Sequence, residues 1–170
     1  ADVICTNCTT SFDKRLRDFQ FETVLIDEAT QACEPECILP MLKGTKHVIL
    51  VGDHCQLGPV IMYKQTVMAG LNMSLFERLI RMGNRPFRLQ IQYRMHPALS
   101  VFPSDTFYEG SLQNGVSAAQ RSIEDFEFPW PDSARPMFFL HTTGTAELSG
   151  SGTTYLNKNE AVNIDVIVSY

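Results

Sequence analysis

Two short apolar runs, each followed by acidic side chains, form the clearest pattern along the chain. Residues 24–26 read Val-Leu-Ile, and Asp27 and Glu28 follow them. Residues 47–51 read His-Val-Ile-Leu-Val and are followed by a glycine and Asp53. A continuous apolar run bounded by polar residues is typical of a strand buried in a parallel sheet. The pattern therefore predicts two such strands in an α/β fold.

A short helix is predicted between the two strands, over residues 35–42. Pro35 suits a first helical turn, where its missing N–H is not needed, whereas Pro40 should shorten or kink the helix. A strand–helix–strand unit with a right-handed crossover makes its strands parallel neighbours. Their carboxyl ends then share one edge, where ligands of open α/β sheets bind. The side chains that we expect to converge at this edge are Asp27, Glu28, Asp53 and Gln56.

The adjacent carboxylates of Asp27 and Glu28 carry the first functional signal. Two carboxylates side by side cost electrostatic energy unless a cation uses them. A phosphate with its magnesium ion would supply that cation, which suggests nucleotide hydrolysis rather than binding alone. The alternative is a strand that happens to end in a charged turn, since short motifs also match by chance.

A second functional signal lies in residues 90–97, where Arg94 stands between Tyr93 and a His-Pro turn. Phosphoryl transfer builds negative charge on the γ-phosphoryl oxygens, and an arginine from a neighbouring element stabilises that charge. A tyrosine beside it could stack on a nucleobase. The alternative is a structural arginine bonded to a core tyrosine.

Three segments together resemble motifs II, III and IV of superfamily 1 helicases. They are Asp-Glu-Ala-Thr-Gln at residues 27–31, Gly-Asp-His-Cys-Gln-Leu-Gly-Pro at residues 52–59 and Gln-Tyr-Arg-Met-His-Pro at residues 92–97. The closer resemblance is to superfamily 1B RNA helicases of the up-frameshift family, which act in nonsense-mediated mRNA decay. It covers essentially the whole chain and includes residues 74–79 and 107–116. Alanine stands at position 29, where the family would lead us to expect serine.

The resemblance implies a role for each matching residue in a protein that uses ATP and Mg²⁺. Asp27 would hold the magnesium ion, through a water, and Glu28 would orient or deprotonate the attacking water. Gln56 would sense the γ-phosphate and relay its presence to the nucleic-acid face. Arg94 would act as an arginine finger, and Tyr93 would stack on the adenine.

The family also implies a fold, that of P-loop NTPases with two RecA-like lobes and parallel sheets. Residues 1–86 would form the C-terminal part of the first lobe and residues 87–170 the N-terminal part of the second, both incomplete. The sequence contains no Gly-x-x-x-x-Gly-Lys-[Ser/Thr] loop, which cradles the phosphates in such proteins. We therefore expect an internal fragment that by itself hydrolyses ATP at no useful rate.

Candidate RNA contacts follow the apolar residues 3–5, which we expect to form a short strand. Residues 6–10 are rich in hydroxyl and amide groups, which can bond a phosphodiester backbone. The family uses this region in that way, although an ordinary polar turn is the alternative. The candidates assigned to RNA are Thr6, Asn7, Thr9, Pro59 and Val60.

Composition limits these interpretations. The net charge of −5 counts against a nucleic-acid binder, which usually carries a basic footprint. Five of the fourteen basic residues, however, are arginines within residues 78–94. We interpret Arg78 and Arg81 among them as charges on a solvated helix face. No apolar stretch approaches the length of a membrane span, so we expect no membrane partner.

The five cysteines include two pairs with spacings that superficially resemble zinc sites, residues 5 and 8 and residues 33 and 37. Structural zinc sites need four ligands that converge from turns. Here Cys5 ends a predicted strand and Cys37 lies inside a predicted helix. Free thiols in a reducing compartment are the more plausible interpretation.

Further elements are predicted beyond the motifs. A capping box at residues 74–77 opens a helix, and a second one at residues 157–160 precedes a β-branched run that leaves helix or strand open. Residues 137–140 are predicted to form a strand. Trp130 stands between two prolines and is interpreted as a loop anchor.

Two classes of function are compatible with these observations. The first is a cytoplasmic RNA helicase that moves 5′ to 3′ along single-stranded RNA, hydrolyses ATP when RNA is bound, and works with nonsense-mediated decay factors. The second is a nucleotide-gated RNA clamp, or a scaffold for decay factors, without processive motor activity. A DNA helicase of the same superfamily is a further alternative, since nothing in the residues alone decides RNA over DNA.

Overall fold

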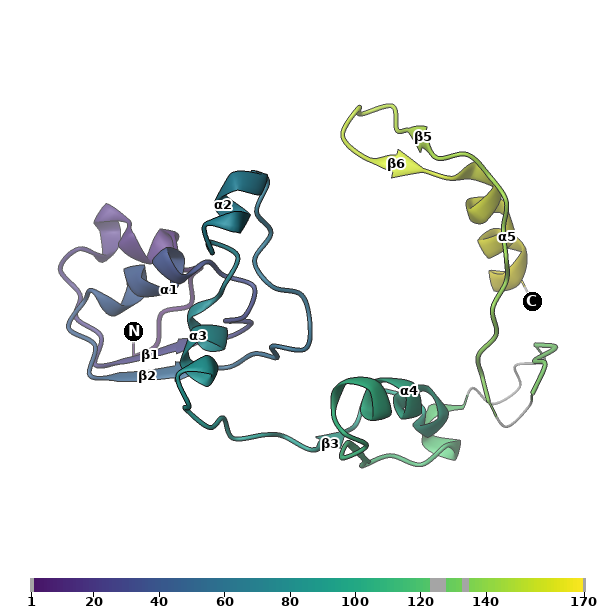
Figure 1. The fold of residues 1–170 in the computed structure, drawn as a ribbon, viewed down its shortest axis with the longest axis horizontal. Coiled ribbons are helices and arrows are strands. Elements are labelled where there is room, and N and C mark those ends of the chain that lie inside the picture. The colour runs from purple at the N-terminus through teal and green to yellow at the C-terminus, as the bar shows by residue number, and fades with distance from the viewer. Residues whose placement is uncertain (1, 123–127, 133–134, 170) are drawn as a thin grey trace. The chain divides into compact units, whose positions relative to one another are not determined.

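The computed structural model describes residues 2–122, 128–132 and 135–169. The chain divides into two compact units, residues 1–88 and residues 89–170 (Figure 1). The assignment of residues 1–86 and 87–170 to two RecA-like lobes stays a prediction.

The first unit is built around two parallel strands, β1 (Thr23–Ile26) and β2 (His47–Leu50). They pair in register from Thr23 with His47 to Ile26 with Leu50. Helix α1 (Glu34–Met41) connects them and packs against β1 (Figure 1). The strand–helix–strand unit with parallel strands is therefore confirmed.

Local sequence signals explain the bounds of α1. Cys33 caps the helix, and its backbone N–H donates to Oε2 of Glu36 at 3.0 Å. Pro35 lies in the first turn, where no intrahelical hydrogen bond is lost. The helix ends one residue after Pro40, which agrees with the predicted shortening.

Four further elements complete the first unit: η1 (Thr10–Phe12), η2 (Lys14–Leu16), α2 (Lys64–Met68) and α3 (Leu75–Arg81). The predicted start of α3 is confirmed, because Oγ of Ser74 accepts a hydrogen bond from the backbone N–H of Glu77 at 3.1 Å. This bond satisfies one of the amide groups that a helix leaves unpaired at its beginning.

The core of the first unit is small. Its buried apolar members are Ile26, Ala29, Cys37 and Leu75. Only one face of β1 packs against it, since Val24 contacts the core whereas the Leu25 side chain is 60% exposed. The expectation of a strand buried on both faces is therefore wrong for the described residues, among which no second layer covers Leu25.

Among its described residues, the second unit contains one parallel and one antiparallel strand pair. Strand β3 (Ile91–Gln92) pairs in parallel with β4 (Gln113–Asn114), and α4 (Pro97–Phe107) lies between them in the chain. Strand β5 (Glu147–Leu148) pairs antiparallel with β6 (Tyr155–Leu156). The remaining elements are η3 (Ala119–Arg121) and α5 (Lys158–Val168).

The sequence did not decide whether the residues after position 157 form a helix or a strand. In the structure they form helix α5. The side chain of Asn157 accepts hydrogen bonds from the backbone N–H groups of Asn159 and Glu160, at 3.1 and 3.3 Å. The cap therefore prevails over the β-branched run, whose strand preference is weak without a neighbouring strand.

Two predicted strands are wrong. Residues 3–5 and 137–140 belong to no strand and to no helix. Val3 is 78% exposed and Phe139 is 88% exposed, so no described neighbour buries either segment. A strand needs a partner for its backbone groups, and β propensity alone does not supply one.

Trp130 contacts two aromatic rings, with centroid distances of 4.6 Å to Phe128 and 5.9 Å to Phe138. These contacts agree with its interpretation as a loop anchor. None of the helices in the described part of the chain combines the length and apolar character that a membrane span requires.

Candidate functional site

The acidic pair lies directly after β1, in a turn with unusual backbone geometry. Asp27 and Glu28 are both exposed, and Glu28 has a φ of 52°. Residues other than glycine rarely adopt this left-handed conformation, and those that do cluster at functional sites. Oδ1 of Asp27 accepts from the Glu28 N–H at 3.0 Å, and Gln31 donates from Nε2 to Oε2 of Glu28 at 3.1 Å. The carboxylates are therefore held at the carboxyl end of β1.

A tight turn over residues 53–56 follows β2. The carbonyl of Asp53 accepts from the Gln56 N–H at 3.1 Å, and Oδ1 of Asp53 accepts from the Cys55 N–H at 3.0 Å. Oδ2 of Asp53 accepts from Nε2 of Gln56 at 2.8 Å. One carboxylate therefore fixes both the backbone of the turn and the direction of the Gln56 side chain.

The two loops meet at the same edge of the sheet. The Ala29 N–H donates to the carbonyl of Val51 at 2.8 Å, which joins them beyond the last strand pair. Gly52 packs against Thr30 so closely that an added Cβ would lie 3.0 Å from Cγ2 and 3.1 Å from the backbone N of Thr30. Glycine is therefore the residue that allows this approach.

This edge fits a phosphate with its magnesium ion. Magnesium prefers oxygen ligands, and the exposed carboxylates of Asp27 and Glu28 supply them. Thr30 is 3% exposed, and within the described residues its Oγ1 has no hydrogen-bond partner. A buried hydroxyl without a partner is uncommon, so Thr30 leaves one hydrogen-bonding group at this edge for a polar ligand.

The segment after β3 positions the two residues predicted to contact the nucleotide from the second unit. Oε1 of Gln92 accepts from the backbone N–H groups of Arg94 and Met95, at 2.9 and 2.7 Å. Arg121 donates from its guanidinium to the backbone carbonyls of Tyr93 and Arg94, the latter at 3.0 Å. Sequence reasoning missed Arg121, because nothing in the sequence near position 121 points to residues 27 positions earlier.

The side chains of Tyr93 and Arg94 point away from any core. The Tyr93 side chain is 61% exposed, so it is not the core tyrosine that the alternative interpretation requires. Its ring lies over Gly115, where an added Cβ would come within 2.1 Å of Cε1. No carboxylate among the described residues forms an ion pair with Arg94.

The candidate RNA contacts lie in two exposed loops of the first unit. Thr6, Asn7 and Thr9 are exposed, and Oδ1 of Asn7 accepts from the Thr10 N–H at 2.7 Å, which closes the turn before η1. Val60 is 84% exposed, whereas Pro59 is buried. Pro59 therefore supports the loop from its buried side, and Val60 is the residue that an RNA strand could reach.

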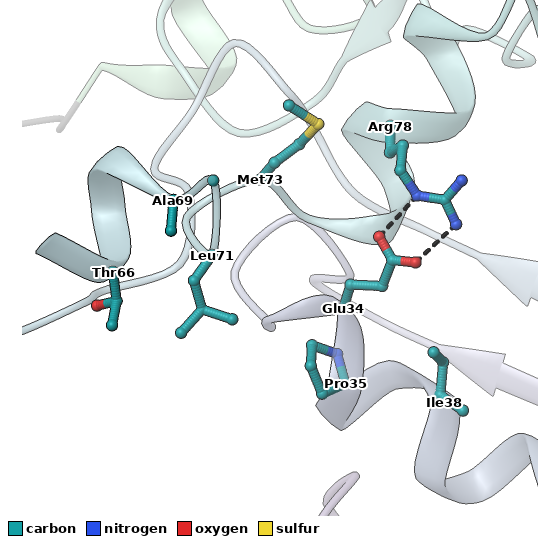
Figure 2. Close-up of a pocket in the computed structure, with 9 residues that line it drawn as sticks. Glu34, Pro35, Ile38, Thr66, Ala69, Leu71, Met73 and Arg78 are labelled. Carbon is teal, nitrogen blue, oxygen red and sulfur yellow. Dashed lines mark hydrogen bonds and ion pairs between the residues drawn. The ribbon is translucent and has the colours of Figure 1, made fainter.

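The structure corrects the interpretation of Arg78. Its guanidinium forms two hydrogen bonds with Glu34, from Nη2 to Oε1 at 2.6 Å and from Nε to Oε2 at 2.7 Å (Figure 2). These bonds lower the pKa of Glu34 and raise that of Arg78. Arg81 instead pairs with Glu77 on its own helix at 2.6 Å, as expected for a solvated helix face. Arg78 joins elements 44 residues apart, which periodicity cannot reveal.

A cavity of about 570 Å³ lies beside the Glu34–Arg78 pair (Figure 2). Its other walls are formed by Pro35, Ile38, Thr66, Ala69, Gly70, Leu71 and Met73. None of the residues predicted from the motifs lines it. Its charged end is already internally paired, so the cavity is mainly apolar space between α1, α2 and α3.

The four cysteines whose spacing superficially resembles zinc sites differ widely in exposure. Cys5 is exposed and Cys37 is fully buried. Burial, together with the nearby Cys8 and Glu36, raises the pKa of Cys37 to about 11. Within the described residues, the cysteines at positions 5, 8, 33 and 37 belong to no cluster with metal-binding geometry.

Comparisons with known proteins agree with the motif analysis. Residues 1–64 and residues 71–170 each match an AAA domain family. Over 169 residues, the chain is 59% identical to a regulator of nonsense transcripts 1 homolog from Arabidopsis thaliana and 57% identical to one from Drosophila melanogaster. It is 56% identical to the ATP-dependent helicase NAM7 of Saccharomyces cerevisiae.

These three matches cover 99% of this chain but only 14%, 14% and 17% of the relatives. The predicted resemblance to up-frameshift helicases is confirmed. The chain spans roughly one-sixth of the length of these relatives, or slightly less.

Proposed function

Because this chain belongs to the AAA domain family, we propose that it forms part of an ATP-dependent RNA helicase that acts in nonsense-mediated mRNA decay. The names of its relatives, regulator of nonsense transcripts 1 and ATP-dependent helicase, support this proposal. In this proposal the two units belong to two RecA-like lobes of a P-loop NTPase, and the protein translocates 5′ to 3′ in the cytoplasm together with decay factors.

The observation that carries the proposal is the parallel register of β1 and β2. This register places the loops after both strands at one edge, where the Ala29 N–H donates to the carbonyl of Val51 and Gly52 packs against Thr30. Carboxyl ends of parallel strands are the usual place for nucleotide binding in open α/β sheets. In the proposed function, Asp27, Glu28 and Gln56 act on the same nucleotide and therefore need to lie at the same edge.

Bound Mg²⁺ and ATP would supply the phosphoryl group and neutralise part of its charge. Asp27 would hold the magnesium ion through a water, and Glu28 would orient or deprotonate the attacking water. Gln56, whose side chain bonds Asp53, would respond to the γ-phosphate and pass that response to the RNA-binding loops. Positioning and charge stabilisation account for nearly all the catalysis that phosphoryl transfer needs.

Arg94 and Tyr93 would serve the same nucleotide from the second unit. Arg94 would stabilise the charge that develops during transfer, and Tyr93 would stack on the adenine. The hydrogen bonds with Gln92 and Arg121 hold the backbone from which these side chains extend. Such preorganisation reduces the entropy lost when the reacting groups come together.

Thr6, Asn7, Thr9 and Val60 would contact single-stranded RNA, with Pro59 supporting Val60. Contacts of this kind go mainly to the sugar–phosphate backbone, so binding would be salt-dependent and tolerant of sequence. These exposed side chains belong to the same unit as the proposed magnesium ligand, Asp27, which allows nucleotide state and RNA affinity to be coupled.

The test measures ATP hydrolysis by a protein that contains this chain together with a phosphate-binding loop. Rates are compared without polymer, with single-stranded RNA and with single-stranded DNA, for the wild type and Glu28→Gln. Glu22→Gln is the matched control, because Glu22 precedes β1 and is exposed in an ion pair with Lys46. RNA stimulation that is lost in Glu28→Gln and kept in Glu22→Gln is the expected result.

Other outcomes point to the alternatives. Hydrolysis that RNA does not change would favour a nucleotide-gated clamp or a decay-factor scaffold, and stronger stimulation by DNA would favour a DNA helicase. Arg94→Ala is expected to abolish turnover while sparing much of the nucleotide binding, with Arg81→Ala as its control. Gln56→Ala is expected to keep hydrolysis but lose its dependence on RNA.

A further inference from the structure

We propose that Asp53, His54 and Cys55 form a binding site for a borderline transition metal of the Zn²⁺ type. One ligand atom from each of these residues lies within 4.8 Å of the other two. It is the only such group of histidine, cysteine and acidic side chains within the described part of the chain. The site is distinct from the proposed magnesium ligand, Asp27.

The turn after β2 explains how three consecutive side chains come together. In a strand, neighbouring side chains point to opposite faces, and in a helix they are spread around the axis. Here the Asp53 carbonyl accepts from the Gln56 N–H at 3.1 Å, and Oδ1 of Asp53 folds back onto the Cys55 N–H at 3.0 Å. This folded backbone turns the carboxylate toward the residues that follow it.

The distances are close to those of a tetrahedral metal site. Nε2 of His54 and Sγ of Cys55 lie 3.9 Å apart. Bonds of about 2.0 Å to nitrogen and about 2.3 Å to sulfur, at a tetrahedral angle, would place these atoms about 3.5 Å apart. Small side-chain rotations therefore suffice to bring them around one ion, and a water would complete the coordination as a fourth ligand.

The donor set selects the class of metal. Thiolate and imidazole ligands suit Zn²⁺ and its neighbours in the first transition row, whereas Mg²⁺ takes oxygen ligands and keeps several waters. Binding requires the thiolate of Cys55, and its proton passes to the solvent. His54 is exposed and Cys55 is partly buried, so an ion can reach the site from solution.

The surroundings of Asp53 hold its carboxylate in place. Oδ2 accepts from Nε2 of Gln56 at 2.8 Å while Oδ1 accepts from the Cys55 N–H. Partners of this kind orient metal ligands and strengthen binding. A metal at Asp53 would in turn act on the Gln56 side chain, because the metal and the Gln56 amide would bind the same carboxylate.

The test uses Co²⁺ as a spectroscopic substitute for Zn²⁺ on this chain under reducing conditions. We expect a thiolate-to-cobalt charge-transfer band in the near ultraviolet and visible bands typical of tetrahedral cobalt. Zn²⁺ should remove both, and a large excess of Mg²⁺ should not. The ¹⁵N resonance of the Gln56 side-chain amide should shift when Zn²⁺ is added.

Variants separate this site from the other thiols. Cys55→Ser should abolish the charge-transfer band, whereas Cys5→Ser, which alters an exposed thiol in a different loop, should keep it. His54→Asn should weaken the apparent affinity at least about tenfold, since even the loss of an outer-shell partner costs that much. His47→Asn is its control, because His47 is an exposed residue at the start of β2.

Circular dichroism will show whether each variant keeps the fold. A charge-transfer band that is unchanged in a folded Cys55→Ser variant would overturn the proposal, as would a wild-type chain that shows no such band at saturating Co²⁺. Should Cys55→Ser lose its fold, equal cobalt affinities of folded His54→Asn and His47→Asn would overturn it as well.

Discussion

Replacing Gly52 with alanine should loosen the contact between the two loops that build the proposed nucleotide site. The new Cβ would lie 3.0 Å from Cγ2, 3.1 Å from the backbone N and 3.2 Å from Oγ1 of Thr30. Ordinary contacts of this kind are 3.4–4 Å long, so the neighbours must give way by several tenths of an ångström. The backbone N of Thr30 has little room to move, because the preceding Ala29 N–H is bonded to Val51 at 2.8 Å.

The expected cost follows from two opposing effects. Overpacking of a close contact destabilises by about 1–3 kcal/mol. Alanine also reduces the entropy of the unfolded chain, which returns about 0.4–1 kcal/mol. We therefore expect Gly52→Ala to lower the free energy of local unfolding by about 1–2 kcal/mol, which corresponds to about a 5- to 30-fold change in the equilibrium.

Gly58→Ala is the matched control in the same loop. Its added Cβ would meet only the Asn72 carbonyl oxygen, at an ordinary 3.8 Å. Native-state hydrogen exchange of the Val51 and Ala29 amides measures the opening of this edge directly. These amides should exchange about 5- to 30-fold faster in Gly52→Ala and no faster in Gly58→Ala.

Equal exchange rates in these two variants would refute the reasoning. A further check adds Thr30→Ala to Gly52→Ala, which removes Cγ2 and Oγ1 but leaves the backbone N. The double variant should recover part of the protection, because residues in contact show coupled effects on stability.

Three further predictions follow from other contacts. Gly115→Ala should displace the Tyr93 ring, since the new Cβ would lie 2.1 Å from Cε1, and the nuclear Overhauser contact between the ring and residue 115 should disappear. Burial raises the pKa of Cys37 to about 11, above the ordinary 9.0. The stability that this thiol contributes is therefore complete below pH 9 and should be lost between pH 9 and about 11. Urea titrations of a Cys37→Ala variant should not show this loss. Arg78 lowers the pKa of Glu34, so the ion pair stabilises the folded chain above the ordinary pKa of 4.5, and this stabilisation is lost on acidification. Between pH 7 and pH 3, the thermal midpoint of Glu34→Gln should therefore drop less than that of the wild type.

Much of the fold around the proposed site could be predicted from short sequence signals. The apolar runs, the proline in the first helical turn and the capping serine each act over a few residues, and the structure confirms β1, β2, α1 and the start of α3. The parallel pairing also followed, because a right-handed crossover leaves few other arrangements. The motif resemblance then supplied the family.

The same local signals failed where a partner segment decides the outcome. Residues 3–5 and 137–140 have apolar, β-prone sequences but find no strand to pair with in the described structure. The run after Asn157 became helix because its cap acts within three residues, whereas a strand would have needed a distant neighbour. Strand formation is therefore less readable from sequence than helix capping.

The sequence by itself predicted which residues would carry the chemistry: the acidic pair, the Asp53 turn and the Tyr93–Arg94 segment. Only the tertiary structure decided what holds these loops, namely Gly52 against Thr30 and Arg121 on the backbone of Arg94, and what joins α1 to α3, namely Glu34 opposite Arg78. The physical reason is range. Side chains and caps act on residues within a turn of them, whereas these supporting contacts join segments that are 22 to 44 residues apart and meet only after the chain has folded.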